Sequence, residues 1–332
     1  MTTVARCDLT PYRAVRAILL LLPLFISGCA TVDLSFLFDE ELRQYELQPA
    51  AGRTRAKVAV VDISGIITSE TIGSFLVDAD CTPEMVTAVL NQIEQDRHVK
   101  AVVLRIDSPG GEVTASDIIH QELVRFKART GLPVYTAMMG LACSGGCYIA
   151  MAGDRVFAHP TTVTGSIGVI ARFPKLTGLA DKVGYHEVIL QSGGMKSSSH
   201  PLVEMSPEMI AIYQKMIDEM YGRFLDVVVD ARPAYADRAA LAPVADGRIY
   251  TASQALELGL IDDIDYLPNV IRAVMRQAGL DDASVVTYIR GHAVDSNLYS
   301  QLRNAAPQIN LVNLDLGALA PDGPGFFYLW KP

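Results

Sequence analysis

The alternation of short β-rich runs with helical segments is the feature that most constrains the fold of this chain. Residues 57–63 and 101–106 are rich in valine and isoleucine, which favour strands. Between them, Pro83 to Gln95 has apolar residues at helical spacing, and Thr82 is in position to cap the start of the helix. Because strands that alternate with helices form parallel sheets with crossover helices, we predict an α/β fold.

The same alternation continues towards the C-terminus. The second strand is expected to end at Asp107, where a Ser-Pro-Gly-Gly turn begins. The further elements that we expect are a helix to about residue 129, a strand over 133–138, a short helix over 144–152, strands over 155–158 and 188–190, a long helix over about 207–230 and a short helix within 250–262. For the aromatic segment Phe326 to Trp330 we expect a closing strand or cap, with contact to lipid or to a neighbouring subunit as the alternative.

The first 28 residues have the pattern of a targeting segment rather than of a folded domain. Three arginines precede an apolar run over 17–27, which is too short to span a bilayer comfortably. The run ends in Ile-Ser-Gly before Cys29, a pattern that resembles a bacterial lipobox. We therefore expect a lipoprotein-type signal peptide over 1–28, lipidation of Cys29, and a tether over 29–56 that anchors the folded domain to a membrane of the bacterial cell envelope, outside the cytoplasm. An uncleaved signal anchor is the alternative.

Charge and cysteine content exclude some classes of function. The formal net charge is −9, which argues against a nucleic-acid binder, since such a protein needs a basic surface. The sequence has no Cys-x-x-Cys pair and no histidine and cysteine cluster that would indicate a metal site. Of the remaining cysteines, Cys81, Cys143 and Cys147, we predict that the last two are packing residues and are not joined in a disulfide.

Two glycine-rich segments could carry chemistry. Ser144 lies between a predicted strand and a predicted helix and is followed by two glycines, which would expose its hydroxyl at a helix N-terminus. The Ser-Pro-Gly-Gly segment ending at Gly111 follows another strand, where glycines let backbone N–H groups approach a ligand. The ordinary alternatives are an N-cap serine and a plain strand-to-helix turn.

A serine nucleophile needs a base, because its hydroxyl is a poor nucleophile at neutral pH. None of the histidines lies in a recognisable triad motif; they are His98, His120, His159, His186, His200 and His292. A lysine can serve instead when burial favours its neutral form. Lys196 lies in a loop of small residues that could deliver its long side chain into a crevice, although a solvated surface lysine is the ordinary alternative.

Several motifs, taken together in order and spacing, resemble the signal peptide peptidase A (SppA) family in its short, single-unit form. The matching segments are Ser144 to Ala150, Thr164 to Val169, Gly194 to Lys196, Gly247-Arg248 and Gln254 to Asp262. The resemblance covers roughly residues 57 to 275, which we take as the peptidase domain, with 276–332 as a C-terminal extension. It departs from the family pattern at Cys143 and Cys147, where alanine and tyrosine are commoner.

The resemblance implies a ClpP/crotonase-type fold, an α/β architecture of layered, mostly parallel sheets with crossover helices. It also implies Ser144 as nucleophile, Lys196 as general base and Ser166 as the residue that hydrogen-bonds the lysine. The oxyanion hole would be formed by the N–H groups of Gly111 and Gly145, and no cofactor or metal is needed.

The function implied is that of a serine endopeptidase that degrades signal peptides or other hydrophobic peptides at a membrane. Short members of the family assemble as rings, so we expect a homo-oligomer in which each active site takes its lysine from a neighbour. Two alternatives stay open, a crotonase-like acyl-CoA hydrolase or hydratase and an inactive lipoprotein scaffold of the same fold.

Overall fold

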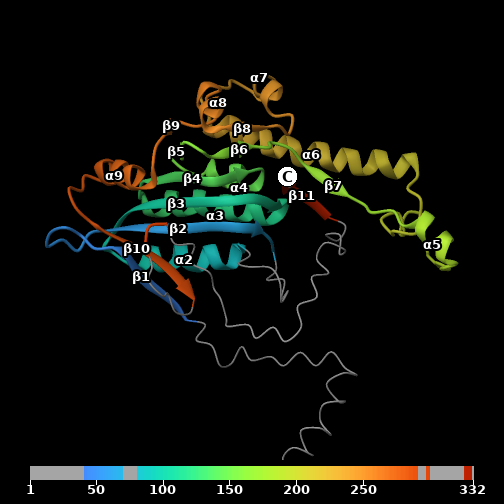
Figure 1. Ribbon diagram of the computed structural model, residues 1–332, viewed down its shortest axis with the longest axis horizontal. Helices are drawn as coiled ribbons and strands as arrows, with labels where there is room; N and C mark the ends of the chain where they lie inside the picture. Colours follow the sequence, from blue (N-terminus) through green and yellow to red (C-terminus); the bar gives the residue numbers. More distant parts are fainter. Residues whose placement is uncertain (1–40, 70–80, 291–296, 300–324, 331–332) are drawn as a thin grey trace, which may run out of the picture. The chain divides into compact units, whose positions relative to one another are not determined.

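The computed structural model describes residues 41–69, 81–290, 297–299 and 325–330 (Figure 1). Most strands of this part of the chain form one sheet in the order β1-β10-β2-β3-β4-β5-β9. Their bounds are β1 (Leu42–Gln48), β2 (Lys57–Ile67), β3 (Val99–Glu112), β4 (Val134–Cys143), β5 (Arg155–Ala158), β9 (Asp263–Ile264) and β10 (Ser284–Arg290). From β10 to β9 the neighbours are parallel, and only β1 at the edge runs antiparallel. The predicted α/β class with a mostly parallel sheet is thus confirmed.

Helices cover both faces of this sheet. Their bounds are α2 (Pro83–Gln95), α3 (Val113–Thr130), α4 (Gly145–Ala150), α5 (Thr177–Val183), α6 (Pro207–Ala231), α7 (Arg238–Leu241), α8 (Ala252–Glu257) and α9 (Leu267–Gln277), with a 3-10 turn over Ala242–Val244. Alternate residues of β2 belong to different cores, since side chains of a strand point to opposite faces. Val58 and Val60 pack with α9, whereas Val61 and Ile63 pack with α2, α3 and α4.

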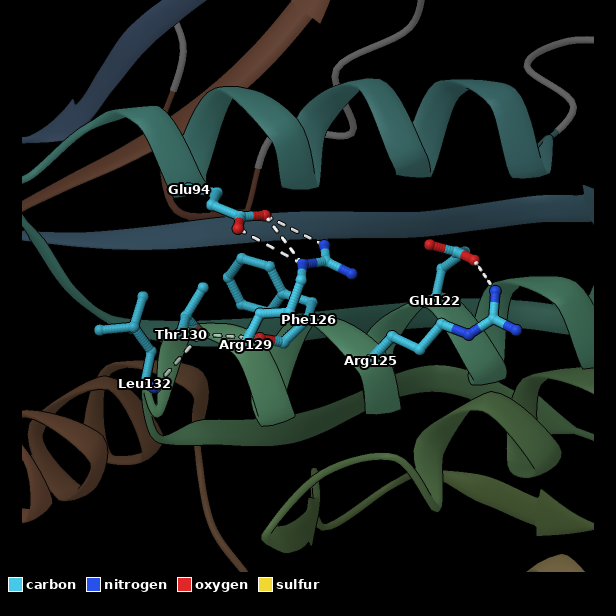
Figure 2. Close-up of polar contacts among 7 residues, drawn as sticks. All are labelled: Glu94, Glu122, Arg125, Phe126, Arg129, Thr130 and Leu132. Carbon is cyan, nitrogen blue, oxygen red and sulfur yellow. Dashed lines mark hydrogen bonds and ion pairs between the residues drawn. The ribbon is translucent and has the colours of Figure 1, made fainter.

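The helix predicted over residues 83–95 forms with those bounds. Thr82 caps it by accepting a hydrogen bond from the N–H of Met85, and proline occupies its first turn. Its buried side chains face the sheet beside α3. On the exposed side, the carboxylate of Glu94 on α2 pairs with the guanidinium of Arg129 on α3 (Figure 2).

The second strand is longer than its sequence predicts. We expected an end at Asp107, but β3 continues through the Ser-Pro-Gly-Gly segment to Glu112. Irregular pairing in this segment lets it follow β2, and Ile67 of β2 is the partner of Gly111. Strand pairing therefore overrides the turn preference of proline and glycine here. A local bulge shifts the register between β2 and β3 so that the pairing can continue.

The sheet also extends beyond the expected domain limits of 57 and 275. Within the segment expected to be a tether, Leu42–Gln48 forms β1 and pairs with β10, which itself lies in the expected C-terminal extension. The physical reason is that β2 pairs with β3 on one edge only. Without β10, the backbone N–H and C=O groups on its other edge would be unpaired. The expected strand over 188–190 does not form; these residues are irregular, and Val188 and Leu190 are exposed.

The signal peptide and Cys29 lie outside the described residues. Within the described ranges, no helix has both the length and the apolarity needed to cross a bilayer.

Three short strands complete the fold near the C-terminal end of β4. β6 (Val163–Gly165) pairs with β4 and with β8 (Ile249–Thr251), and β7 (Ile170–Arg172) follows β6 in the chain. The last described element, β11 (Gly325–Leu329), pairs antiparallel with the end of β3 on one side and with β7 on the other (Figure 1). The closing strand expected for the aromatic segment is confirmed.

Candidate active site

Ser144 occupies a sharp turn between β4 and α4. Its backbone has φ 52° and ψ −113°, a conformation that residues other than glycine rarely adopt. The turn is held because the Ser144 N–H donates to the carbonyl of Gly165 at 2.8 Å and the Ser144 carbonyl accepts from the N–H of Tyr148 at 2.8 Å. A serine held in a strained strand-to-helix turn is the geometry that α/β hydrolases use to present a nucleophile.

Ser166 lies beside this turn. It follows Gly165, the partner of Ser144, and is the other non-glycine residue with positive φ among the described residues, at 51°. The Ser166 N–H donates to the carbonyl of Arg248 at 2.7 Å, which ties β6 to β8. The structure therefore brings together two of the three residues proposed for catalysis, Ser144 and Ser166, from separate motifs.

The two glycines predicted to form an oxyanion hole also meet. A Cβ atom placed on Gly145 would lie 3.2 Å from the backbone nitrogen of Gly111 and 3.2 Å from the Cα of Gly110. A Cβ on Gly111 would lie 1.9 Å from the carbonyl oxygen of Ile67, so only glycine fits at this position. Backbone N–H groups that converge beside a nucleophile can stabilise the negative charge of a tetrahedral intermediate.

Ser108 is a residue of the candidate site that no sequence motif predicted. Its hydroxyl is buried, donates to the carbonyl of Gly65 at 2.6 Å and accepts from the N–H of Gly110 at 3.1 Å. Gly110 has φ 100°, and this hydrogen bond holds it in that conformation. A serine before Pro-Gly-Gly was the only signal in the sequence, and it can equally mark an ordinary turn.

The cysteines that flank the nucleophile pack in the interior. Cys143 and Cys147 are buried, and the thiol of Cys143 lies 3.4 Å from the carbonyl oxygen of Val163. Burial raises the pKa of Cys143 to about 12 and also raises the pKa of Cys147. Both thiols are therefore protonated at neutral pH and do not compete with Ser144 as nucleophiles.

Lys196 is not brought to Ser144 within a single chain. Its side chain is exposed in the loop between α5 and α6. None of the hydrogen bonds or ion pairs in the described part of the chain joins it to Ser144 or Ser166. That each active site takes its lysine from a neighbour stays a prediction. In the single chain, large apolar residues of the segment that carries Lys196 are exposed as well, among them Val188 and Leu190.

The comparisons with known proteins agree with this geometry. The family model described as "Peptidase family S49" matches residues 127–281, and the model described as "Clp protease" matches residues 60–165. The Enterococcus faecium protein named "Putative signal peptide peptidase SppA" is 33% identical over 237 residues, which cover 71% of this chain and 68% of that protein. The chain belongs to peptidase family S49.

Other relatives differ in length. A protein of Synechocystis named as a putative protease is 34% identical over 237 residues, covering 71% of this chain and 80% of its own length. "Protease 4" of Haemophilus influenzae is 31% identical over 229 residues, covering 68% of this chain but only 36% of its own length. The chain thus has the single-unit length that its sequence predicts.

Family membership confirms three predictions. The chain is an S49 serine peptidase, its substrates are peptides, and its domain has the ClpP/crotonase-type fold. The individual roles assigned to Ser144, Lys196, Ser166, Gly111 and Gly145 stay predictions. The structure brings the two serines together and the two glycines together, and it leaves Lys196 exposed.

Proposed function

We propose that this S49 peptidase is an endopeptidase that degrades signal peptides or other hydrophobic peptides beside a membrane of the bacterial cell envelope. The observation that carries the proposal is the strained turn at Ser144, which lies against Ser166 and against the glycines of a second loop. Anchoring through lipid on Cys29 would hold the active site near hydrophobic segments released from the bilayer. The match to a protein named as a signal peptide peptidase supports this class of substrate.

In the proposed mechanism, neutral Lys196 removes the proton of the Ser144 hydroxyl, and the alkoxide attacks a peptide carbonyl carbon. The N–H groups of Gly111 and Gly145 bind the oxyanion. Lys196 then protonates the leaving amine, and water hydrolyses the ester on Ser144. Ser166 orients the lysine, as the third group does in other triads.

A fluorophosphonate probe tests the nucleophile directly. We expect labelling of the wild-type protein on Ser144 and none of Ser144→Ala. Ser253→Ala serves as the control and should be labelled like the wild type, because Ser253 is an exposed serine of α8. Labelling that persists in Ser144→Ala would refute the assignment, and a folded wild-type protein that is never labelled would indicate an inactive scaffold.

Substrate and location need separate measurements. A strain that lacks this protein should accumulate cleaved signal peptides, which peptidomics of its membranes would detect. Metabolic labelling with an alkyne fatty acid should tag the wild-type protein but not Cys29→Ser. Unchanged peptide pools would remove the proposed substrate, and equal tagging would remove the proposed anchor.

A further inference from the structure

Two side chains that flank the Gly110-Gly111 pair tie this pair to β2. In the ladder between β2 and β3, the two glycines lie opposite the last two residues of β2. Ser108 comes before the pair and Glu112 comes directly after it, and the side chain of each hydrogen-bonds the chain near the end of β2. The glycine pair, which includes an N–H group predicted to bind the oxyanion, is therefore held from both of its ends.

The hydroxyl of Ser108 connects two irregular points of the backbone. It donates to the carbonyl of Gly65 at 2.6 Å and accepts from the N–H of Gly110 at 3.1 Å. Both glycines have positive φ, 78° for Gly65 and 100° for Gly110, and the register between β2 and β3 shifts beside them. Because Ser108 is fully buried, removing its hydroxyl would deprive both backbone groups of this partner with no water to replace it. The hydroxyl thus fixes the bulge of β2 and the turn of β3 to each other.

The carboxylate of Glu112 makes the second connection. It accepts from the hydroxyl of Thr68 at 3.1 Å and from the N–H of Ser69 at 2.9 Å, and it also accepts from the Ser69 hydroxyl. Glu112 is the N-cap residue of α3, but its side chain makes no capping hydrogen bond to that helix. Side chains at this position commonly cap the N–H groups of their own helix. Here the side chain binds the residues that follow β2 instead.

The glycine pair needs these connections because glycine does not restrict its own backbone. The backbone nitrogen of Gly111 lies 3.2 Å from the position that a Cβ on Gly145 would occupy, so the predicted oxyanion hole is formed where two separate loops meet. An N–H group stabilises an oxyanion most when it already points at the place where the negative charge develops. A rotation of the peptide planes around Gly110 would turn the Gly111 N–H away from that place.

We propose that Ser108 and Glu112 are positioning residues for the peptidase reaction, which direct the Gly111 N–H at the oxyanion from the two ends of the glycine pair. Both side chains act through the backbone of Gly111 and make no contact with the reacting atoms. This proposal rests on the proposed function, with Ser144 as nucleophile and the N–H groups of Gly111 and Gly145 as the oxyanion hole. It adds two side chains on which the rate of the reaction depends.

Fluorophosphonate labelling of the full-length protein separates a positioning role from a role in folding, because it gives two quantities. The final fraction of labelled chains counts the folded sites. The rate constant of labelling reports how well each site stabilises the negative oxygen that develops on phosphorus as Ser144 attacks.

We expect Ser108→Ala to reach the labelled fraction of the wild type with a rate constant that is lower by about tenfold or more, since loss of a whole oxyanion donor costs about 100- to 1000-fold. For a hydrophobic fluorogenic peptide, kcat should fall by a similar factor, with KM changed by less than about threefold. Thr287→Val is the matched control. The buried Thr287 hydroxyl donates to the carbonyl of Val60, earlier in β2, at 3.0 Å, so this variant loses a similar hydrogen bond and should keep the wild-type rate constant.

Glu112 is tested with a conservative variant. Glu112→Ala should slow labelling by about tenfold, whereas Glu112→Gln keeps an acceptor oxygen for Ser69 and should recover most of the wild-type rate constant. Glu122→Ala is the matched control and should react like the wild type. Glu122 lies further along α3, where it pairs with Arg125 of the same helix (Figure 2).

Two results would overturn this proposal and leave the proposed function intact. One is a wild-type rate constant of labelling in Ser108→Ala and Glu112→Ala. The other is a lower labelled fraction in these variants with a wild-type rate constant for the sites that remain, which is the result for residues that only stabilise the fold. If the wild-type protein itself is not labelled on Ser144, the proposed function fails, and this proposal fails with it.

Discussion

At the scale of single residues, Gly111 is a position of the candidate site where the neighbouring backbone leaves no room for a side chain. Gly111→Ala would place a Cβ 1.9 Å from the Ile67 carbonyl oxygen, so β2 and β3 must separate. We expect a loss of about 3 kcal/mol in the free energy of unfolding, together with loss of peptidase activity. Gly178→Ala is the control, since a Cβ there meets nothing within 4 Å, and its effect should stay within about 1 kcal/mol. Urea denaturation measures both, and equal midpoints would contradict the predicted clash.

Because His120 is buried, we expect the free energy of unfolding to fall in mild acid. Burial is the main cause that lowers the pKa of His120 to about 4, and its Nδ1 atom has no hydrogen-bond partner among the described residues. The unfolded chain binds a proton at His120 near pH 6.5, whereas the folded chain does so only near pH 4. Stability is therefore complete above about pH 6.5 and falls by roughly 3 kcal/mol as the pH decreases to about 4.

The variant His120→Phe isolates this effect. It keeps an aromatic ring against Tyr148, which His120 contacts edge-on at 5.2 Å. We expect its unfolding free energy to change less than that of the wild type between pH 6.5 and pH 4. Parallel stability curves for the two proteins over this range would show that His120 does not titrate as described.

At the scale of elements, two ion pairs of similar appearance should differ strongly in effect. The guanidinium of Arg105 on β3 is almost fully buried and binds both oxygens of Asp62 on β2 at 3.0 and 2.8 Å. The Arg129 and Glu94 pair, which joins α3 to α2, is exposed on both sides (Figure 2). When one partner of a buried ion pair is removed, the other partner keeps a buried charge that neither a counter-ion nor water compensates. When one partner of an exposed pair is removed, water solvates the charge that is left.

We therefore expect Asp62→Ala to lower the free energy of unfolding by about 3 to 5 kcal/mol. The corresponding cost for Glu94→Ala should be below about 1 kcal/mol, because its partner Arg129 keeps its hydration. Thermal unfolding of the two variants under the same conditions gives the comparison. Similar melting temperatures would mean that the burial of Arg105 is not maintained in solution.

At the scale of the whole molecule, the exposed Lys196 fits a site shared between subunits. The segment that carries it also exposes large apolar side chains, an arrangement that favours burial against another copy of the chain. They are Leu176, Leu179, Val183, Tyr185, Val188 and Leu190. We propose a ring-like homo-oligomer in which the lysine loop of one subunit reaches Ser144 of the next, which would complete the dyad that the single chain leaves open.

Co-expression of Ser144→Ala with Lys196→Ala tests this arrangement. Each variant alone should be inactive. With random mixing, roughly a quarter of the shared sites would hold both native residues, so mixed particles should regain about that fraction of activity. Lys215→Ala is the matched control, since Lys215 is an exposed lysine of α6 and this variant alone should keep the activity of the wild type. Mixed particles that co-assemble yet stay inactive would contradict shared sites.

The sequence by itself determined the elements whose signals are local. The helix over residues 83–95 is specified by Thr82, Pro83 and the spacing of its apolar residues, and all of these act within a few turns of chain. The motif order also predicted that Ser144, Ser166, Gly111 and Gly145 meet, because the carboxyl ends of neighbouring parallel strands share one edge of the sheet.

Only the tertiary structure decided the contacts between segments far apart in the chain. The strand pairing that carries β3 past Asp107, the joining of β1 to β10, and the insertion of β11 between β3 and β7 each depend on a partner backbone that no local pattern names. The position of Lys196 was likewise not predictable from local sequence, because it lies in a loop that has no hydrophobic periodicity. Hydrogen bonds between strands are made by the backbone, which is alike in all residues, so the partner of an edge strand is chosen by the packing of the whole fold.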